Sequence, residues 1–188
     1  RAVVNVHYKA EVLEAHIAAR QSAGLGPQVK ISDERGLLLE TGGGVVKALP
    51  LLGERPFLIC NSDTTWVETE VRNLERVIAG WDAARMDSLM LLAKRERSLG
   101  YSGEGDFHIA ADGRLARRGA DETSPYVFTG VSIADPRMFA DVQQGRFSLN
   151  LVWDRAIASN RLYGMVLDGW WMHVGTPPAL LDAELFIA

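Results

Sequence analysis

Residues 56–63 have the sequence PFLICNSD, in which an apolar run from Pro56 to Cys60 is followed at once by Asn61, Ser62 and Asp63. A short run with almost no polar position is typical of a strand in the middle of a parallel sheet that is covered on both faces. In open α/β sheets, ligands bind beyond the carboxyl ends of such strands. A carboxylate at that place can hold a Mg²⁺ ion that also contacts substrate phosphates, so Asp63 is a candidate catalytic and metal-binding residue. Its alternative role is to cap a following helix.

Strand and helix patterns alternate around this stretch. In the N-terminal half we expect strands at 2–6, 28–32 and 87–93, and helices at 10–20, 45–52 and 68–81. In the C-terminal half we expect a hairpin over 107–118, a strand at 126–133, a helix over 147–159, a second hairpin around Asp168-Gly169, and a closing helix at 177–186 capped by Thr176. The alternation predicts a single α/β domain with an inserted antiparallel part.

The composition excludes several classes of protein. The chain has 188 residues, of which 47% are apolar and 23% charged, so a disordered or fibrous chain is excluded. The net charge is −4 with the basic residues scattered, which gives no support to a nucleic-acid partner. No apolar run is long enough to span a bilayer, and we expect no membrane association. The single cysteine, Cys60, fits a reducing compartment and predicts a cytoplasmic protein.

A run of three glycines, Gly42, Gly43 and Gly44, precedes the helix expected at 45–52. Glycines before a helix let a ligand approach the backbone closely, and the helix N-terminus adds unpaired N–H groups. The same run is equally compatible with a plain turn. Its spacing matches neither a Walker A loop nor a dinucleotide fingerprint.

Two further segments carry polar groups that could serve a site. Residues 169–177 contain paired tryptophans, which favour a core or a pocket wall, and His173, which as a lone imidazole is more often structural. Residues 103–107 form an acidic glycine loop that is either a turn or a contact for a polar ligand such as a sugar.

Taken in order, these segments resemble the sugar-1-phosphate nucleotidyltransferases. Five motifs carry the resemblance: Asn5-x-His7-Tyr8, Glu40-Thr41-Gly42-Gly43-Gly44, Asn61-Ser62-Asp63, Thr129-Gly130-Val131 and Trp171-x-His173-Val174-Gly175-Thr176-Pro177. They match, in turn, the family's second strand and helix, its base-binding glycine segment, its N-G-D or N-S-D metal motif, the strand that lines its sugar site and its W-x-D-V-G-T-P motif. Each motif is weak alone, but five in the right order over nearly the whole chain are specific.

The resemblance implies a Rossmann-like fold with a mixed, mainly parallel sheet, helices on both faces and a small antiparallel sugar-binding part. It implies that an NTP and a sugar 1-phosphate give an NDP-sugar and pyrophosphate, by a uridylyl or guanylyl transfer of the UDP-N-acetylmuramate or GDP-mannose type. We expect the sugar to be a cell-wall sugar. It assigns Mg²⁺ to Asp63. The remaining implied site residues are Gly42, Gly43, Gly44 and Asn61 for the nucleotide, and Glu40, Asp106 and Gly130 for the sugar.

The chain departs from the family at two places. His173 stands where the family has an Asp metal ligand, and it is the second candidate metal ligand beside Asp63. Because imidazole suits ions other than Mg²⁺, His173 indicates a weaker Mg²⁺ site, another divalent ion, or a phosphate contact by the protonated imidazole. The family's triphosphate-binding segment, G-x-G-x-R with P-K-P, does not occur in residues 1–188. We therefore expect a single nucleotidyltransferase domain that lacks its N-terminal strand and triphosphate loop. A non-catalytic nucleotide-sugar-binding or regulatory protein is the alternative, and the oligomeric state stays open.

Overall fold

The computed structural model describes residues 1–188 as two compact units. Unit 1 comprises residues 1–55 and 139–154, and unit 2 comprises residues 56–138 and 155–188. The boundary between the units falls inside α4 (Asn150–Ala158). None of the helices combines the length and the apolar character that a bilayer span requires.

Unit 1 contains a parallel pair of strands joined by a helix. β1 (Ala2–Val6) pairs in parallel with β2 (Val29–Asp33), and α1 (Ala10–Ser22) connects them. A crossover of this kind is what a parallel pair needs, because the chain must return to the same end of the sheet. α2 (Glu40–Leu52) packs against both strands. The first three predicted elements are therefore confirmed.

Unit 2 is built around a mixed sheet. Its strand order is β10 (Leu162–Val166), β5 (Ser88–Lys94), β9 (Tyr126–Ala134), β7 (Phe107–Ile109) and β8 (Leu115–Arg117), with β3 (Phe57–Cys60) also paired to β9. β10 and β5 are parallel, whereas β9 is antiparallel to β5, β3 and β7. The predicted 107–118 hairpin is present as the β7–β8 pair. The mixed α/β architecture expected from the sequence is confirmed, but most strand pairings in this sheet are antiparallel, so the sheet is not mainly parallel as expected.

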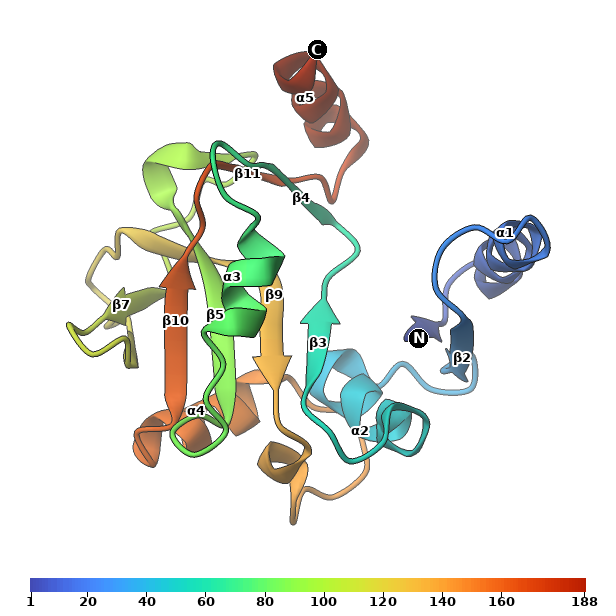
Figure 1. Ribbon diagram of the computed structural model, residues 1–188, viewed down its shortest axis with the longest axis horizontal. Coiled ribbons are helices and arrows are strands. Elements are labelled where there is room, and N and C mark those ends of the chain that lie inside the picture. Colours follow the sequence, from blue (N-terminus) through green and yellow to red (C-terminus); the bar gives the residue numbers. More distant parts are fainter. The chain divides into compact units, whose positions relative to one another are not determined.

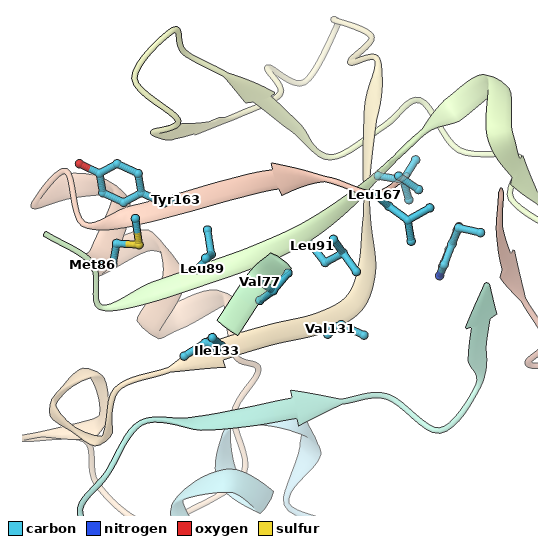
Figure 2. Close-up of a cluster of buried hydrophobic side chains, with 11 residues drawn as sticks. Val77, Met86, Leu89, Leu91, Val131, Ile133, Tyr163 and Leu167 are labelled. Atoms are coloured by element: carbon cyan, nitrogen blue, oxygen red, sulfur yellow. The ribbon is translucent and has the colours of Figure 1, made fainter. Parts of the chain in front are cut away.

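The core of unit 2 lies on β5 and its neighbours. Figure 2 shows Leu89 and Leu91 of β5, Val131 and Ile133 of β9, and Val77 of α3 (Asn73–Ala79) between the two strands in this view. Val77, Leu91 and Val131 have no exposed surface. Six of the seven residues of β5 are buried, which explains why this strand has the near-continuous apolar sequence that predicted it. In Figure 1, β10, β5 and β9 lie side by side with α3 across them.

β3 differs from the strand that its sequence predicted. Residues 57–60 form an outer strand whose only strand partner is β9, in antiparallel orientation. Phe57 and Ile59 are half-buried, whereas Leu58 and Cys60 are exposed. The expectation of a central strand covered on both faces was therefore wrong for this structure, because an apolar run does not state how many neighbours a strand has.

A second sheet in unit 2 replaces the predicted C-terminal hairpin. β11 (Trp170–His173) lies between β4 (Thr64–Val67), to which it is antiparallel, and β6 (Ser98–Leu99), to which it is parallel. β10 instead belongs to the main sheet, so β10 and β11 do not pair with each other. Gly169, with φ of 127°, carries the chain from one sheet to the other in a conformation that favours glycine.

The helix predicted over 68–81 is shorter, because side chains bind the backbone of its first residues. Asp168 Oδ2 accepts hydrogen bonds from Thr69 Oγ1 at 2.5 Å and from the Glu70 N–H at 3.0 Å. Glu68 Oε1 accepts one from the Asn73 N–H at 2.7 Å. These bonds hold a loop, and α3 begins only at Asn73.

The remaining elements are short helices and the C-terminal helix. Arg95–Arg97 and Pro136–Phe139 are 3-10 helices. The helix predicted over 147–159 is present as the shorter α4, Asn150–Ala158. α5 (Pro177–Ile187) is capped as predicted, since Thr176 Oγ1 accepts a hydrogen bond from the Ala179 N–H at 3.3 Å.

Asp168→Asn should remove a pH-dependent contribution to stability. The hydrogen bonds from Thr69 and Glu70 lower the pKa of the Asp168 carboxyl below its ordinary value. A lowered folded-state pKa stabilises the protein above the unfolded pKa of about 3.9, and this contribution is lost as pH falls through the folded-state value. Urea unfolding should show a difference between wild type and Asp168→Asn at pH 7 that shrinks towards pH 3. Asp182→Asn, an exposed control on α5, should show no such trend, and a pH-independent Asp168→Asn difference would contradict the assignment.

Candidate active site

Asp63 and His173 lie side by side in unit 2 because β4 pairs with β11. In that register Thr64 is opposite His173, and the Val174 N–H donates to the Asp63 carbonyl oxygen at 2.8 Å. His173 Nε2 is 3.4 Å from Asp63 Oδ2. The two side chains are 42% and 48% exposed, so both are accessible to a ligand. The structure thus brings together the two residues that the sequence assigned to the metal.

A buried hydrogen-bond network lies directly beneath this pair. Thr64 Oγ1 donates to the Thr129 carbonyl oxygen at 2.8 Å, and Trp171 Nε1 donates to the same oxygen at 3.0 Å. Trp171 Nε1 also contacts Thr64 Oγ1. The Thr129 hydroxyl in turn donates to the Leu91 carbonyl oxygen at 2.8 Å, which ties the site to the core strand β5.

The sequence predicted no role for Thr64, and it predicted Trp171 only as part of the core or a pocket wall. In the structure both fix the strands that carry Asp63 and His173. No local pattern could have found this network, because its members come from β4, β9 and β11.

Asn61 and Gly130 form a second close contact beside Asp63. The Asn61 N–H donates to the Gly130 carbonyl oxygen at 2.9 Å. Gly130 has φ of 85°, and a Cβ added there would lie 2.8 Å from Asn61 Cβ. The predicted nucleotide residue and the predicted sugar residue are therefore neighbours, and the contact requires glycine at position 130.

Asp106 is fixed by the backbone of β9. Its Oδ2 accepts a hydrogen bond from the Phe128 N–H at 2.8 Å, and its own N–H donates to the Tyr126 carbonyl oxygen at 2.8 Å. Asp106 thus holds β9 two residues before Gly130.

The glycine run lies in unit 1 and begins α2 instead of preceding it. The helix starts at Glu40, an exposed residue with φ of 64°, so the expected start at Val45 was wrong. The N–H groups of Gly42 and Gly43 donate to the Phe147 carbonyl oxygen at 2.9 and 3.1 Å. A Cβ at Gly42 would lie 2.3 Å from Phe147 Cε2, and one at Gly43 would lie 2.1 Å from the Gly145 carbonyl oxygen. Residues 145–147 therefore occupy the space that side chains at Gly42 and Gly43 would need.

A buried carboxylate that the sequence analysis missed anchors the start of α2. Glu34 is 4% exposed, and its Oε1 accepts a hydrogen bond from Asn5 Nδ2 at 2.6 Å. Its Oε2 accepts one from the Leu39 N–H at 3.1 Å, and Asn5 Nδ2 also donates to the Gly44 carbonyl oxygen at 3.0 Å. A Cβ at Gly44 would lie 2.8 Å from Glu34 Oε1, so this glycine makes room for the carboxylate.

A cavity of about 330 Å³ adjoins the glycine run in unit 1. It is lined by residues before α2, by one face of α2 and by the 144–145 segment: Gly36, Leu37, Leu39, Gly43, Val46, Lys47, Gln144 and Gly145. Of the three predicted nucleotide-binding glycines, Gly43 reaches this cavity.

Other candidate groups do not join the Asp63–His173 pair. Asp168 is engaged with the 69–70 backbone, and no group of three or more His, Cys, Asp or Glu side chains forms a metal cage. Partial desolvation raises the pKa of the Cys60 thiol above its ordinary value, which does not favour a thiolate nucleophile.

The chain is 46% identical over 187 residues to the N-acetylmuramate alpha-1-phosphate uridylyltransferase of Caulobacter vibrioides, covering 100% of this chain and 77% of that protein. This chain belongs to the sugar-1-phosphate nucleotidyltransferase family. A protein of the same name from Neisseria meningitidis serogroup B is 28% identical over 169 residues, covering 89% of this chain and 70% of the relative. No protein-family profile matches the chain.

Solved structures agree on the fold. HddC from Yersinia pseudotuberculosis, complexed with GMP-PN, has a TM-score of 0.74 at 16% identity, covering 100% of this chain and 79% of that one. An apo UDP-glucose pyrophosphorylase has a TM-score of 0.73 at 11% identity, covering 100% of this chain and 81% of that one. The Rossmann-like nucleotidyltransferase fold is thereby confirmed. The relatives lend no support to the GDP-mannose option or to a non-catalytic protein.

Gly43→Ala should destabilise the protein because its Cβ has no room beside the Gly145 carbonyl oxygen. Overpacking of this kind costs about 1–3 kcal/mol. Gly36→Ala is a matched control, since nothing lies within 4 Å of its added Cβ and its φ is not in the left-handed region. Urea unfolding monitored by circular dichroism should show the loss for Gly43→Ala only. Equal stabilities of the two variants would contradict the packing argument.

Proposed function

We propose that this protein transfers a uridylyl group from UTP to N-acetylmuramate α-1-phosphate, which gives UDP-N-acetylmuramate and pyrophosphate. The observation that carries the proposal is the 46% identity to the Caulobacter vibrioides uridylyltransferase over the full chain. The adjacent Asp63 and His173 side chains in unit 2 are the groups through which this chain would act on the phosphates.

The reaction needs positioning and charge neutralisation more than covalent chemistry. An oxygen of the sugar phosphate attacks the α-phosphorus of UTP in line and forms a new P–O bond. The bond from the α-phosphorus to the bridging oxygen breaks, and pyrophosphate leaves with that electron pair. The protein must hold the two substrates in this geometry and offset the charge that accumulates on the phosphate oxygens.

Asp63 and His173 fit a divalent ion that completes its coordination with substrate. Mg²⁺ is commonly bound by one or two carboxylates together with substrate phosphates, and Asp63 supplies one such hard oxygen ligand. His173 supplies an imidazole, which suits ions other than Mg²⁺, so the same pair also suits a different divalent ion in place of Mg²⁺. When bound, such an ion would neutralise charge on the α-phosphate. The metal ligands in this proposal are Asp63 and His173.

The remaining proposed contacts are given for each unit separately. In unit 2, Asn61 beside Asp63 binds the nucleotide, while Gly130 and Asp106 shape the sugar pocket. In unit 1, Gly43 borders a cavity, and the absence of side chains at Gly42 and Gly44 permits the close packing of α2; the glycine run and Glu40 stay predicted contacts for the nucleotide and the sugar. The single cysteine fits a reducing compartment, and we place the reaction in the cytoplasm.

The test is pyrophosphate release by the full-length protein with Mg²⁺ or Mn²⁺. UTP, GTP, dTTP and ATP would each be combined with the 1-phosphates of N-acetylmuramate, N-acetylglucosamine and mannose. We expect release with UTP and N-acetylmuramate α-1-phosphate above all other pairs. Preference for GTP with mannose 1-phosphate would overturn the proposal. So would silence from a folded protein that still binds nucleotide sugars.

The same assay with the Asp63→Asn variant tests the role of the Asp63 carboxylate. Loss of the carboxylate should lower kcat by at least about 100-fold, which corresponds to about 2.7 kcal/mol of transition-state stabilisation. Asp121→Asn, an exposed acidic residue of the same unit, should leave kcat unchanged. An Asp63→Asn variant with wild-type turnover would exclude Asp63 from the catalytic centre.

A further inference from the structure

Unit 2 contains a cavity of about 340 Å³ that none of the proposed site residues lines. Its lining residues come from the 3-10 helix at 95–97 and from the loop that leads to β7: Arg95, Glu96, Tyr101, Ser102 and Gly103. Both segments lie beside β6, and β6 pairs with β11, the strand that ends at His173.

Ring contacts through Trp171 link a residue that lines this cavity, Tyr101, to His173. The Tyr101 ring packs edge-on against Trp171 with ring centroids 6.2 Å apart, and the Trp171 and His173 centroids are 6.1 Å apart. Gly100, with φ of 75°, approaches the same place, since a Cβ added there would lie 2.6 Å from the His173 carbonyl oxygen. A sugar whose phosphate reaches Asp63 can therefore extend towards this cavity.

The substrate in the proposed function has a group that most sugar phosphates lack. N-acetylmuramate carries a carboxylate on an ether side chain, whereas N-acetylglucosamine has a neutral hydroxyl at that position. A carboxylate that leaves water needs a cation with unused N–H groups, because burying it unpaired is costly. A protein that acts on this sugar acid should therefore place such a cation beside its sugar site.

Four arginines of unit 2 already use their side chains within the protein. Arg118 donates to four carbonyl oxygens, Arg137 and Arg161 both donate to Asp87 Oδ1, and Arg114 donates to Asp112 and Asn160. Arg95 differs from them because it lines the cavity and its side chain donates only through Nη2, to Glu104 Oε2 at 3.1 Å. That pair is partly exposed and therefore weak, and it leaves the other guanidinium N–H groups for a ligand.

The other lining groups are compatible with an anion beside Arg95. Tyr101 Oη accepts a hydrogen bond from the Gly105 N–H at 3.1 Å, which leaves its own proton to donate. Desolvation raises the pKa of Tyr101, so this hydroxyl stays protonated. Ser102 adds a second hydroxyl, and the Glu96 carboxylate, which also lines the cavity, is exposed and lies 3.9 Å from Lys94 Nζ.

We propose that this cavity is the subsite for the sugar carboxylate, and that Arg95 is the residue that makes the protein select a sugar acid phosphate over a neutral amino-sugar phosphate. Arg95 binds the carboxylate through its free guanidinium N–H groups, and Tyr101 donates a hydrogen bond beside it. This inference rests on the proposed function, because it assumes that the sugar is N-acetylmuramate.

The test compares Arg95→Gln with Arg97→Gln in the full-length protein. Arg97 is an exposed residue of the same 3-10 helix that does not line the cavity. With UTP saturating, Arg95→Gln should raise the KM for N-acetylmuramate α-1-phosphate at least about tenfold while kcat changes less than about twofold. Turnover of N-acetylglucosamine 1-phosphate should stay within about twofold of wild type, and Arg97→Gln should alter neither substrate.

Two results would overturn the assignment of Arg95. Equal losses with both sugars would make Arg95 a general structural residue, and an unchanged KM would remove it from the sugar site. If the wild-type protein turns over no sugar phosphate, the proposed function fails separately. Calorimetric binding of N-acetylmuramate α-1-phosphate then decides the subsite, since Arg95→Gln must weaken binding at least about tenfold for the subsite to stand.

Discussion

The antiparallel pairing of β4 with β11 is the constraint on which the proposed catalytic centre depends. It sets Thr64 opposite His173 and joins the Val174 N–H to the Asp63 carbonyl oxygen, so two residues 110 positions apart in sequence come within 3.4 Å. Thr129, from the neighbouring main sheet, accepts hydrogen bonds from both paired strands and fixes them over the core. Because β6 extends the same small sheet, the cavity containing Arg95 is positioned by this pairing as well.

The sequence predicted the elements whose signal is local. β5 is apolar because both its faces are covered, and α5 begins where Thr176 and Pro177 specify a helix start. The sequence could not show which strands pair with each other. Residues 162–173 resemble a hairpin around Gly169, yet the two strands join different sheets, and the apolar β3 is an outer strand. The loop at 68–72 was missed because Asp168, far away in sequence, binds its backbone.

The glycine run shows why the site was harder to predict than the fold. Close approach of a ligand and close approach of another part of the chain both require the absence of a Cβ. In unit 1, Phe147, Gly145 and Glu34 fill the positions where side chains at Gly42, Gly43 and Gly44 would stand. The Asn61–Gly130 contact has the same character. Motif order indicated which residues belong together, while Glu34, Thr64 and Arg95 carry no pattern that a single sequence reveals.

We propose that Asp63 and His173 hold a divalent ion only together with nucleotide phosphates, because two protein ligands are too few for a closed cage. The most direct measurement is Mn²⁺ binding to the full-length protein, monitored by water-proton relaxation with and without UTP. We expect weak Mn²⁺ binding to the free protein. With UTP present, Mn²⁺ binding should be at least about tenfold tighter, beyond the binding by UTP alone. This gain should be lost when Asp63 is replaced by Asn. Tight Mn²⁺ binding without UTP, or an unchanged gain in the Asp63→Asn variant, would contradict this proposal.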